Sequence, residues 1–198
     1  VPVKGYFEEN CYFYINDNTK HAFIIDPGAQ ADILMKIITD NGIVIEKIIL
    51  THGHFDHIKA CDGLYDHYHC PIYLHPEDEA LARDKDAGHT FGITSYLSCP
   101  TLPLKEGKME IGPFRFEVIF TPGHTMGSVI FVFDHYIFSG DTLFKGSVGR
   151  TDLQGGDMRL LKESLRIFKS FKQEYFILPG HDDPTTLSRE LAENYYLR

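Results

Sequence analysis

The sequence contains few cysteines and no long apolar run. Its four cysteines include no C-x-x-C pair, a pattern that fits a reduced cytosolic protein better than a disulfide scaffold. No apolar run approaches the ~20 residues that a membrane-spanning helix needs. Residues 1–10 lack the apolar core of a signal peptide, but the chain does not begin with Met, so a removed signal peptide stays open. We predict a cytoplasmic protein with no membrane partner.

Basic residues are scarce relative to acidic ones. The chain has 19 Lys and Arg against 28 Asp and Glu, which gives a formal net charge of −9. Phosphate binding needs locally basic surface, so we expect no nucleic-acid partner. Bound divalent cations would offset part of the negative charge.

The length and pattern of the chain suit one domain, residues 1–198, without linkers, tandem repeats or low-complexity segments. Alternating or apolar runs predict strands at residues 5–15, 21–25, 45–50, 71–74, 109–121, 128–133, 136–139 and 175–178. Helical spacing predicts helices at residues 29–39, 58–68, 77–85, 157–171 and 187–196. The pattern suits an α+β fold in which two β-sheets pack face to face with helices outside.

Residues 86–103 show no period, and a loop of this length is a lid, a binding loop or disordered. Within it, the candidate substrate contacts are His89, Phe91, Tyr96 and Ser98.

The densest group of potential metal ligands lies in residues 51–57, directly after the predicted strand at 45–50. Histidine nitrogen and carboxylate oxygen suit zinc, iron and manganese. Because residues two apart in an extended chain point to the same side, His52 and His54 can share one ion. Asp56 and His57 are adjacent in sequence, so they are better placed to serve a second ion after the chain turns. A chance cluster among 11 histidines is the alternative, but four ligands within six residues are not expected by chance.

Three further ligand candidates follow a glycine at the end of an apolar run. These are His124, Asp141 and His181. A glycine at that place lets the chain bend so that the next side chain enters a shared cleft. Taken singly, each histidine could be a turn residue and Asp141 could be a helix N-cap. Three repeats of the same pattern are hard to explain by packing.

The ordered set of motifs resembles the metallo-β-lactamase fold superfamily, and within it the glyoxalase II-like hydrolases. The motif T-H-x-H-x-D-H stands at residues 51–57, and the later motifs are TPGHT (121–125), SGDTLF (139–144), GRTD (149–152) and LPGH (178–181). Residues 10–12 and 25–28 also resemble this family. The resemblance spans nearly the whole chain and implies an αββα sandwich of two mixed β-sheets with helices on the outer faces.

The resemblance also implies two divalent metal ions, with zinc as the default and iron or manganese as alternatives. One ion would take His52, His54 and His124, the second would take Asp56, His57 and His181, and Asp141 would bridge both. A metal-bridging hydroxide would attack an acyl carbon, and Asp56 would orient it as the catalytic carboxylate. The expected reaction is hydrolysis of a small-molecule thioester of the hydroxyacylglutathione kind.

The resemblance also implies two substrate-binding residues. Arg150 stands where glyoxalase II places a basic residue that contacts glutathione, and Lys145 lies nearby. The alternatives to substrate binding are a structural salt bridge between Arg150 and Asp152 and a solvated surface position for Lys145. The family places tyrosines where this chain has Asp152 and residues 182–183, and its C-terminal glutathione-binding helical domain has no counterpart here.

Two other activities of the same fold compete with thioester hydrolysis. A persulfide dioxygenase would bind one iron through His52, His124 and Asp141, and a lactonase stays open as well. A β-lactamase of the class with a cysteine ligand would need cysteine where Asp141 stands. A non-catalytic role is disfavoured because no member of the ligand set is missing. Oligomeric state is left open by the sequence.

Overall fold

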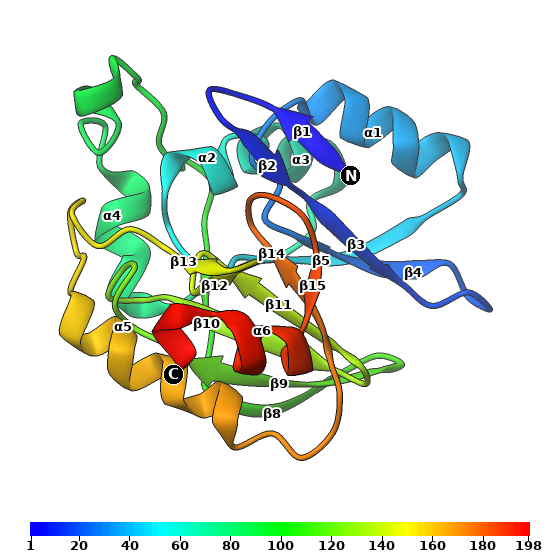
Figure 1. Ribbon diagram of the computed structural model, residues 1–198. Coiled ribbons are helices and arrows are strands. Elements are labelled where there is room, and N and C mark those ends of the chain that lie inside the picture. The colour runs from blue at the N-terminus through cyan, green and yellow to red at the C-terminus, as the bar shows by residue number, and fades with distance from the viewer. The chain divides into compact units, whose positions relative to one another are not determined.

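Figure 1 shows a computed structural model that describes residues 1–198. The chain divides into two compact units, unit 1 (Val1–Leu104) and unit 2 (Lys105–Arg198). Each unit contains one large mixed β-sheet, one two-stranded ribbon and several helices. No helix has both the length and the apolar character needed to cross a bilayer. All four cysteines are buried free thiols.

The large sheet of unit 1 has five strands in the order β3-β4-β5-β6-β7, beside a separate β1-β2 ribbon. The strands are β1 (Pro2–Lys4), β2 (Glu8–Asn10), β3 (Tyr12–Ile15), β4 (His21–Ile25), β5 (Val44–Ile49), β6 (Ile72–Leu74) and β7 (Leu102–Pro103). β3 pairs antiparallel with β4, and β4 to β7 pair parallel. The carboxyl ends of β4, β5 and β6 therefore meet at one edge of the sheet.

Helices cover this sheet because their apolar residues recur at helical spacing. They are α1 (Ala31–Asp40), α2 (Phe55–Ile58), α3 (Cys61–Tyr68), η1 (Pro76–Asp78), α4 (Glu79–Arg83) and η2 (His89–Phe91). Leu34 and Ile38 of α1 and Leu64 of α3 are buried in one cluster with Ile24 and Ile48 of the sheet. Because Leu34 and Ile38 are four residues apart, they lie on the same face of α1, and this face packs on the strands.

The large sheet of unit 2 has six strands in the order β15-β14-β11-β10-β9-β8, beside a β12-β13 ribbon. The strands are β8 (Gly107–Ile111), β9 (Phe114–Phe120), β10 (Val129–Phe133), β11 (Tyr136–Gly140), β12 (Leu143–Phe144), β13 (Ser147–Val148), β14 (Phe176–Pro179) and β15 (Thr185–Thr186). β9 and β11 both pair antiparallel with β10, and β14 pairs parallel with β11. The carboxyl ends of β9, β11 and β14 consequently lie at the same edge.

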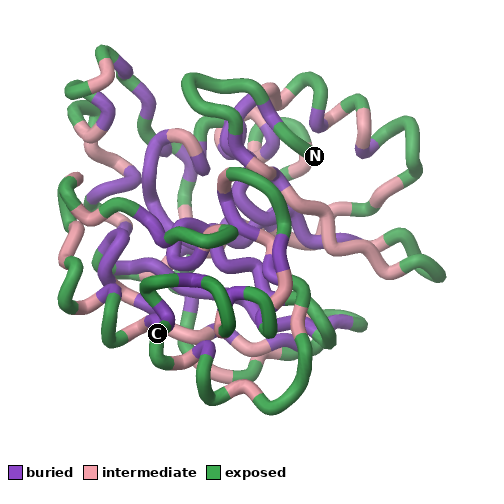
Figure 2. The backbone as a smooth tube through the Cα atoms, viewed as in Figure 1, coloured by how far each residue is buried: buried purple, intermediate pink, exposed green.

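The helices of unit 2 are α5 (Met158–Ser164), η3 (Leu165–Lys169), α6 (Leu187–Glu193) and η4 (Tyr195–Leu197). Asp157 caps α5, because its carboxylate accepts hydrogen bonds from the amides of Arg159 and Leu160. Leu161, Leu165 and Phe168 are buried against the sheet. Figure 2 shows that buried residues follow the strands and that exposed residues lie on the outer turns.

Several predicted elements are confirmed, and others are wrong in detail. The pairing of the first strands, the strands near residues 45–50, 128–133 and 136–139, and the helix near 29–39 are present. Residues 109–121 form two strands, because Gly112 turns the chain with a φ of 57°. The helix predicted at 58–68 is split into α2 and α3, and the one at 157–171 ends in a 3-10 turn. The strand predicted at 5–15 is also divided: its first part, β2, pairs with β1 in a ribbon that was not predicted, and only β3 pairs with β4.

Candidate metal centre

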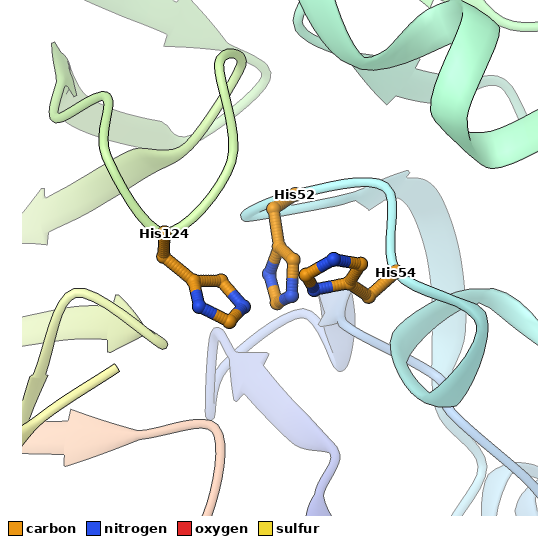
Figure 3. Close-up of side chains that lie close together, drawn as sticks. All are labelled: His52, His54 and His124. Atoms are coloured by element: carbon orange, nitrogen blue, oxygen red, sulfur yellow. The ribbon is translucent and has the colours of Figure 1, made fainter. Parts of the chain in front are cut away.

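The four predicted ligands of unit 1 lie in residues 51–57, here called the ligand loop, which follows β5 and is mostly buried. Residues 48–55 are all buried, and Asp56 alone among the four predicted ligands is partly exposed. The ring centroids of His52 and His54 lie 4.9 Å apart, and those of His52 and His57 lie 4.1 Å apart. Figure 3 shows His52 and His54 extending from this loop. The structure therefore brings together the three predicted histidines of unit 1.

Asp26 organises this loop from the end of the neighbouring strand β4. Its carboxylate accepts hydrogen bonds from the Thr51 amide at 2.7 Å and the Thr51 hydroxyl at 2.5 Å. It also accepts one from His57 Nδ1 at 3.1 Å. A carboxylate only accepts, so His57 carries its proton on Nδ1 and presents the lone pair of Nε2.

The same network sets the tautomer of His52. The Thr51 hydroxyl donates its single proton to Asp26, so toward His52 it can only accept, and it accepts a hydrogen bond from His52 Nδ1 at 3.0 Å. His52 thus also presents the lone pair of Nε2. Ordering ligand histidines through Nδ1 in this way is typical of metal sites.

Two further acidic residues support the loop. Asp78 accepts a hydrogen bond from the Gly53 amide at 2.8 Å, and a Cβ at Gly53 would come within 2.9 Å of the Asp78 carbonyl oxygen. Glu9 is 1 % exposed, accepts a hydrogen bond from the Gly28 amide, and has Oε1 3.9 Å from His57 Nδ1. Burial raises the pKa of the Glu9 carboxyl well above its usual value, although nearby His57 lowers it.

Gly28 lets the backbone of Asp56 approach. A Cβ at Gly28 would lie 1.8 Å from the Asp56 carbonyl oxygen, so no larger residue fits there without a shift of the loop.

The three predicted ligands of unit 2 lie at the shared edge of β9, β11 and β14. His124 Nε2 lies 3.4 Å from Asp141 Oδ2, and His181 Nε2 lies 3.7 Å from the same oxygen. His124 Nδ1 is 2.7 Å from the Arg150 carbonyl oxygen, which only accepts, so His124 also presents Nε2. Figure 3 shows His124 at the tip of its loop. Both histidines of unit 2 therefore direct Nε2 toward one carboxylate oxygen.

These donor sets fit divalent metal ions. Within unit 1, donor atoms of Asp26, His52 and His57 lie within 4.8 Å of one another. The hydrogen bonds that Asp26 accepts from Thr51 and His57 make it a support for the histidines and not a third ligand. In both units, histidines whose Nδ1 already contacts a hydrogen-bond acceptor (His52, His57 and His124) lie near carboxylates. Nitrogen and oxygen donors of this kind suit zinc, iron or manganese. Burial raises the pKa of the Cys61 thiol, so this cysteine is an unsuitable nucleophile or ligand.

The predicted substrate residues are both engaged in exposed ion pairs. Arg150 donates from Nε and a terminal nitrogen to the two carboxylate oxygens of Asp152, each at 2.7 Å. This pairing lowers the pKa of Asp152 to about 2. Lys145 Nζ lies 2.8 Å from Asp183 Oδ2. Arg150 and Lys145 are therefore paired with Asp152 and Asp183, which stand at two places where the resembled family carries tyrosine.

The long loop is anchored at its second half. The Asp62 carboxylate accepts hydrogen bonds from the amides of Ser98 and Cys99 and from the Ser98 hydroxyl at 2.7–3.1 Å. Arg83 donates to the carbonyl oxygens of Leu97 and Cys99, each at 3.1 Å. Of the candidate contacts in this loop, Ser98 thus serves as an anchor. Tyr96 packs under the Lys85 ammonium, His89 begins η2, and Phe91 ends it.

Sequence reasoning missed Glu9 and Asp78 and gave Asp26 no role. Asp26 follows a strand end in the same way as the ligands do, and this signal could have shown it as part of the site. Glu9 carries no such signal, since it lies in a three-residue strand of polar composition.

Comparison with known proteins decides the family. Residues 5–181 match the Metallo-beta-lactamase superfamily. The chain belongs to this superfamily. It is 32 % identical to a hydroxyacylglutathione hydrolase, GloC, of Haemophilus influenzae, over 100 % of this chain and 96 % of that protein.

Two solved structures are also similar. The structure of TTHA1623 in a di-iron-bound form has a TM-score of 0.90 and 37 % identity and covers 100 % of both chains. The BLEG-1 B3 metallo-beta-lactamase has a TM-score of 0.90 and 36 % identity, covering 96 % of this chain and 94 % of that one. The predicted family and α+β fold class are confirmed, and the family is one of metal-dependent hydrolases.

Proposed function

We propose that this protein is a dinuclear metal-dependent hydrolase that cleaves thioesters of the hydroxyacylglutathione type. One ion would be held by His52, His54 and His124, and the other by Asp56, His57 and His181. Asp141 would bridge the two. Zinc is the default metal, and iron is supported by the di-iron form of one similar structure. The buried free thiols fit a reducing compartment, so we place the protein in the cytoplasm.

The observation that carries the proposal is the position of Asp141. A single carboxylate oxygen, Oδ2, faces Nε2 of His124 at 3.4 Å and Nε2 of His181 at 3.7 Å. These histidines belong to different predicted ion sites. A carboxylate that faces ligands of both sites is the arrangement that a bridging ligand requires.

Two bound cations would lower the pKa of a shared water and stabilise negative charge on the acyl oxygen. The residues of the chain do the remaining work. Asp26 and the Arg150 carbonyl hold His57 and His124 in the tautomer that presents Nε2. Asp56, the partly exposed carboxylate of the loop, would accept a hydrogen bond from the attacking water and orient it.

The reaction balances without a protein nucleophile. The water oxygen bonds to the acyl carbon, and the carbon–sulfur bond breaks with its electron pair going to sulfur. The proton lost by the water passes to the thiolate. The products are a carboxylic acid and a thiol.

The glutathione part of the proposal rests on the named relative and on two basic residues. Arg150 and Lys145 would contact the carboxylates of the thiol half of the substrate. Their present partners, Asp152 and Asp183, are highly exposed. Exposed ion pairs contribute only about 0–1 kcal/mol, so a substrate carboxylate can replace them.

The test is turnover of S-lactoylglutathione by protein loaded separately with zinc, iron and manganese. We expect hydrolysis with at least one metal and a loss of at least about 100-fold in kcat for Asp141→Asn. Asp17→Asn, at an exposed turn, is the matched control and should retain activity. Absence of thioester hydrolysis with all three metals overturns the proposal. So does oxygen uptake on glutathione persulfide, or hydrolysis of a lactone or β-lactam, in its place.

A further inference from the structure

Three phenylalanines from three separate segments of unit 1 meet beside the ligand loop. Phe7 lies between β1 and β2, Phe55 begins α2, and Phe91 ends η2. Their ring centroids lie 6.2 Å apart for Phe7 and Phe55, 5.4 Å for Phe7 and Phe91, and 5.8 Å for Phe55 and Phe91. These distances are in the range of favourable aromatic contacts. We call these three residues the phenylalanine cluster.

The phenylalanine cluster is attached to the predicted metal ligands by the chain itself. Phe55 stands between His54 and Asp56, which the proposed function assigns to different ions. Consecutive Cα atoms are about 3.8 Å apart, so the backbone of Phe55 is one residue from each ligand. The phenylalanine cluster therefore adjoins the loop that carries these predicted ligands.

The phenylalanine cluster is only partly covered. Phe55 is 3 % exposed, whereas Phe7 is 41 % exposed and Phe91 is half-buried. Phe7 and its neighbour Tyr6, which is 52 % exposed, are both large side chains presented by a short ribbon. Exposed apolar surface of this kind beside a reactive site is typical of a ligand-binding surface.

The long loop holds its part of the cluster in place. A Cβ at Gly88 would come within 2.9 Å of Ile93, which is 3 % exposed, so the chain on either side of η2 is packed closely. The anchors at Asp62 and Arg83 fix the later part of the loop. The loop thus presents Phe91 from a fixed base, and this supplies a role for residues 86–103.

We propose that the phenylalanine cluster is the seat of the acyl group, so that the preferred substrates are thioesters with an apolar or aromatic acyl group. This inference rests on the proposed thioester hydrolysis. The chemistry of the cluster offers no hydrogen-bond donor to a polar acyl chain. Each methylene buried against it should raise kcat/KM by about 3-fold or more.

The experiment compares two thioesters that share glutathione and a 2-hydroxyacyl carbonyl but differ in their side group. S-mandeloylglutathione carries a phenyl ring where S-lactoylglutathione carries a methyl group. For the metal-loaded protein we expect kcat/KM at least about 10-fold higher for the mandeloyl thioester. Phe7→Ala and Phe91→Ala should bring the ratio near one while retaining two ions per chain. Tyr195→Ala, an exposed aromatic residue of unit 2, is the matched control and should keep the ratio.

A second measurement separates this inference from the proposed function. Calorimetric titration of the metal-loaded protein with mandelate and with lactate measures product binding without turnover. We expect mandelate to bind at least about 10-fold more tightly, and Phe7→Ala to abolish this difference. Failure of both thioesters to react overturns the proposed function alone. Equal binding of the two acids, or an unchanged preference in Phe7→Ala and Phe91→Ala, overturns the acyl seat.

Discussion

At the scale of single residues, the carboxylate of Asp26 controls which nitrogen of His57 can bind a metal. In Asp26→Asn, the side-chain amide would face the Nδ1 proton of His57 with its own protons. His57 would then move its proton to Nε2 and lose its ligand lone pair. We predict that the affinity for the second ion falls 10–100-fold, as measured by metal content after dialysis against increasing concentrations of a chelator. Equal retention of both ions in Asp26→Asn and in the Asp17→Asn control would contradict this account.

Asp152 affects substrate binding and not metal binding. It competes with substrate for Arg150 through two hydrogen bonds of 2.7 Å. Removing its charge in Asp152→Asn should release the guanidinium and lower KM for S-lactoylglutathione by up to about 5-fold, with kcat little changed. The matched variant is Asp183→Asn, which releases Lys145 in the same way. A KM that rises in both variants would show that the acidic residues help the substrate to bind.

At the scale of elements, a glycine sets the path of the loop that carries His124. Gly123 has a φ of 137°, and a Cβ there would lie 2.2 Å from the Leu161 amide nitrogen at the start of α5. We predict that Gly123→Ala destabilises the protein by about 2–4 kcal/mol in urea unfolding, because both strain and overlap are introduced.

Gly112→Ala is the control for the strain alone. Gly112 also has a positive φ, 57°, but no atom lies within 4 Å of a Cβ there. We expect a loss of about 1 kcal/mol in that variant. Equal losses in the two variants would rule out the overlap with α5 as the cause.

The long loop depends on its anchor at Asp62. Burial raises the pKa of this carboxyl, but hydrogen bonds from Ser98 and Cys99 outweigh burial and hold the pKa below its usual value. A carboxyl whose pKa is lower in the folded state stabilises that state above its unfolded pKa, about 3.9. That contribution is lost as the pH falls from about 4 through the folded pKa.

The corresponding variant is Asp62→Asn. We predict a loss of about 1–2 kcal/mol at pH 7 and faster proteolysis within residues 86–97. The difference from the unmodified protein should shrink as the pH falls from about 4 through the folded pKa of Asp62, because the carboxyl then becomes uncharged. A difference that is constant from pH 7 to pH 3 would show that charge on Asp62 is not what anchors the loop.

The elements show how far local pattern could predict this fold. Strands such as β10 and helices such as α1 have long apolar patterns, and these were predicted close to their observed bounds. The β1-β2 ribbon could not be predicted, because each of its strands has only three residues and β2 consists of polar residues alone. Residues 109–121 read as one strand, since a single turn at Gly112 reverses the chain without interrupting the apolar alternation on either side.

At the scale of the whole molecule, the sequence was enough to propose metal ligands but not the residues that support them. The proposed ligands follow strand ends in short motifs, and the matching family model covers residues 5–181. The support arises through space, as between Asp26 and His57, which are 31 residues apart, or between Asp62 and Cys99, which are 37 apart. The parallel pairing of β4 and β5 brings the segments of Asp26 and His57 together, and the packing of the long loop against α3 does the same for Asp62 and Cys99.

The central claim is that the chain holds two ions with Asp141 between them. Elemental analysis of protein purified without added metal tests it most directly, in parallel for the unmodified chain, Asp141→Asn and Asp17→Asn. We predict about two divalent ions per chain for the unmodified protein and Asp17→Asn, and loss of both ions together in Asp141→Asn. One iron per chain in the unmodified protein, or two ions retained in Asp141→Asn, would contradict it.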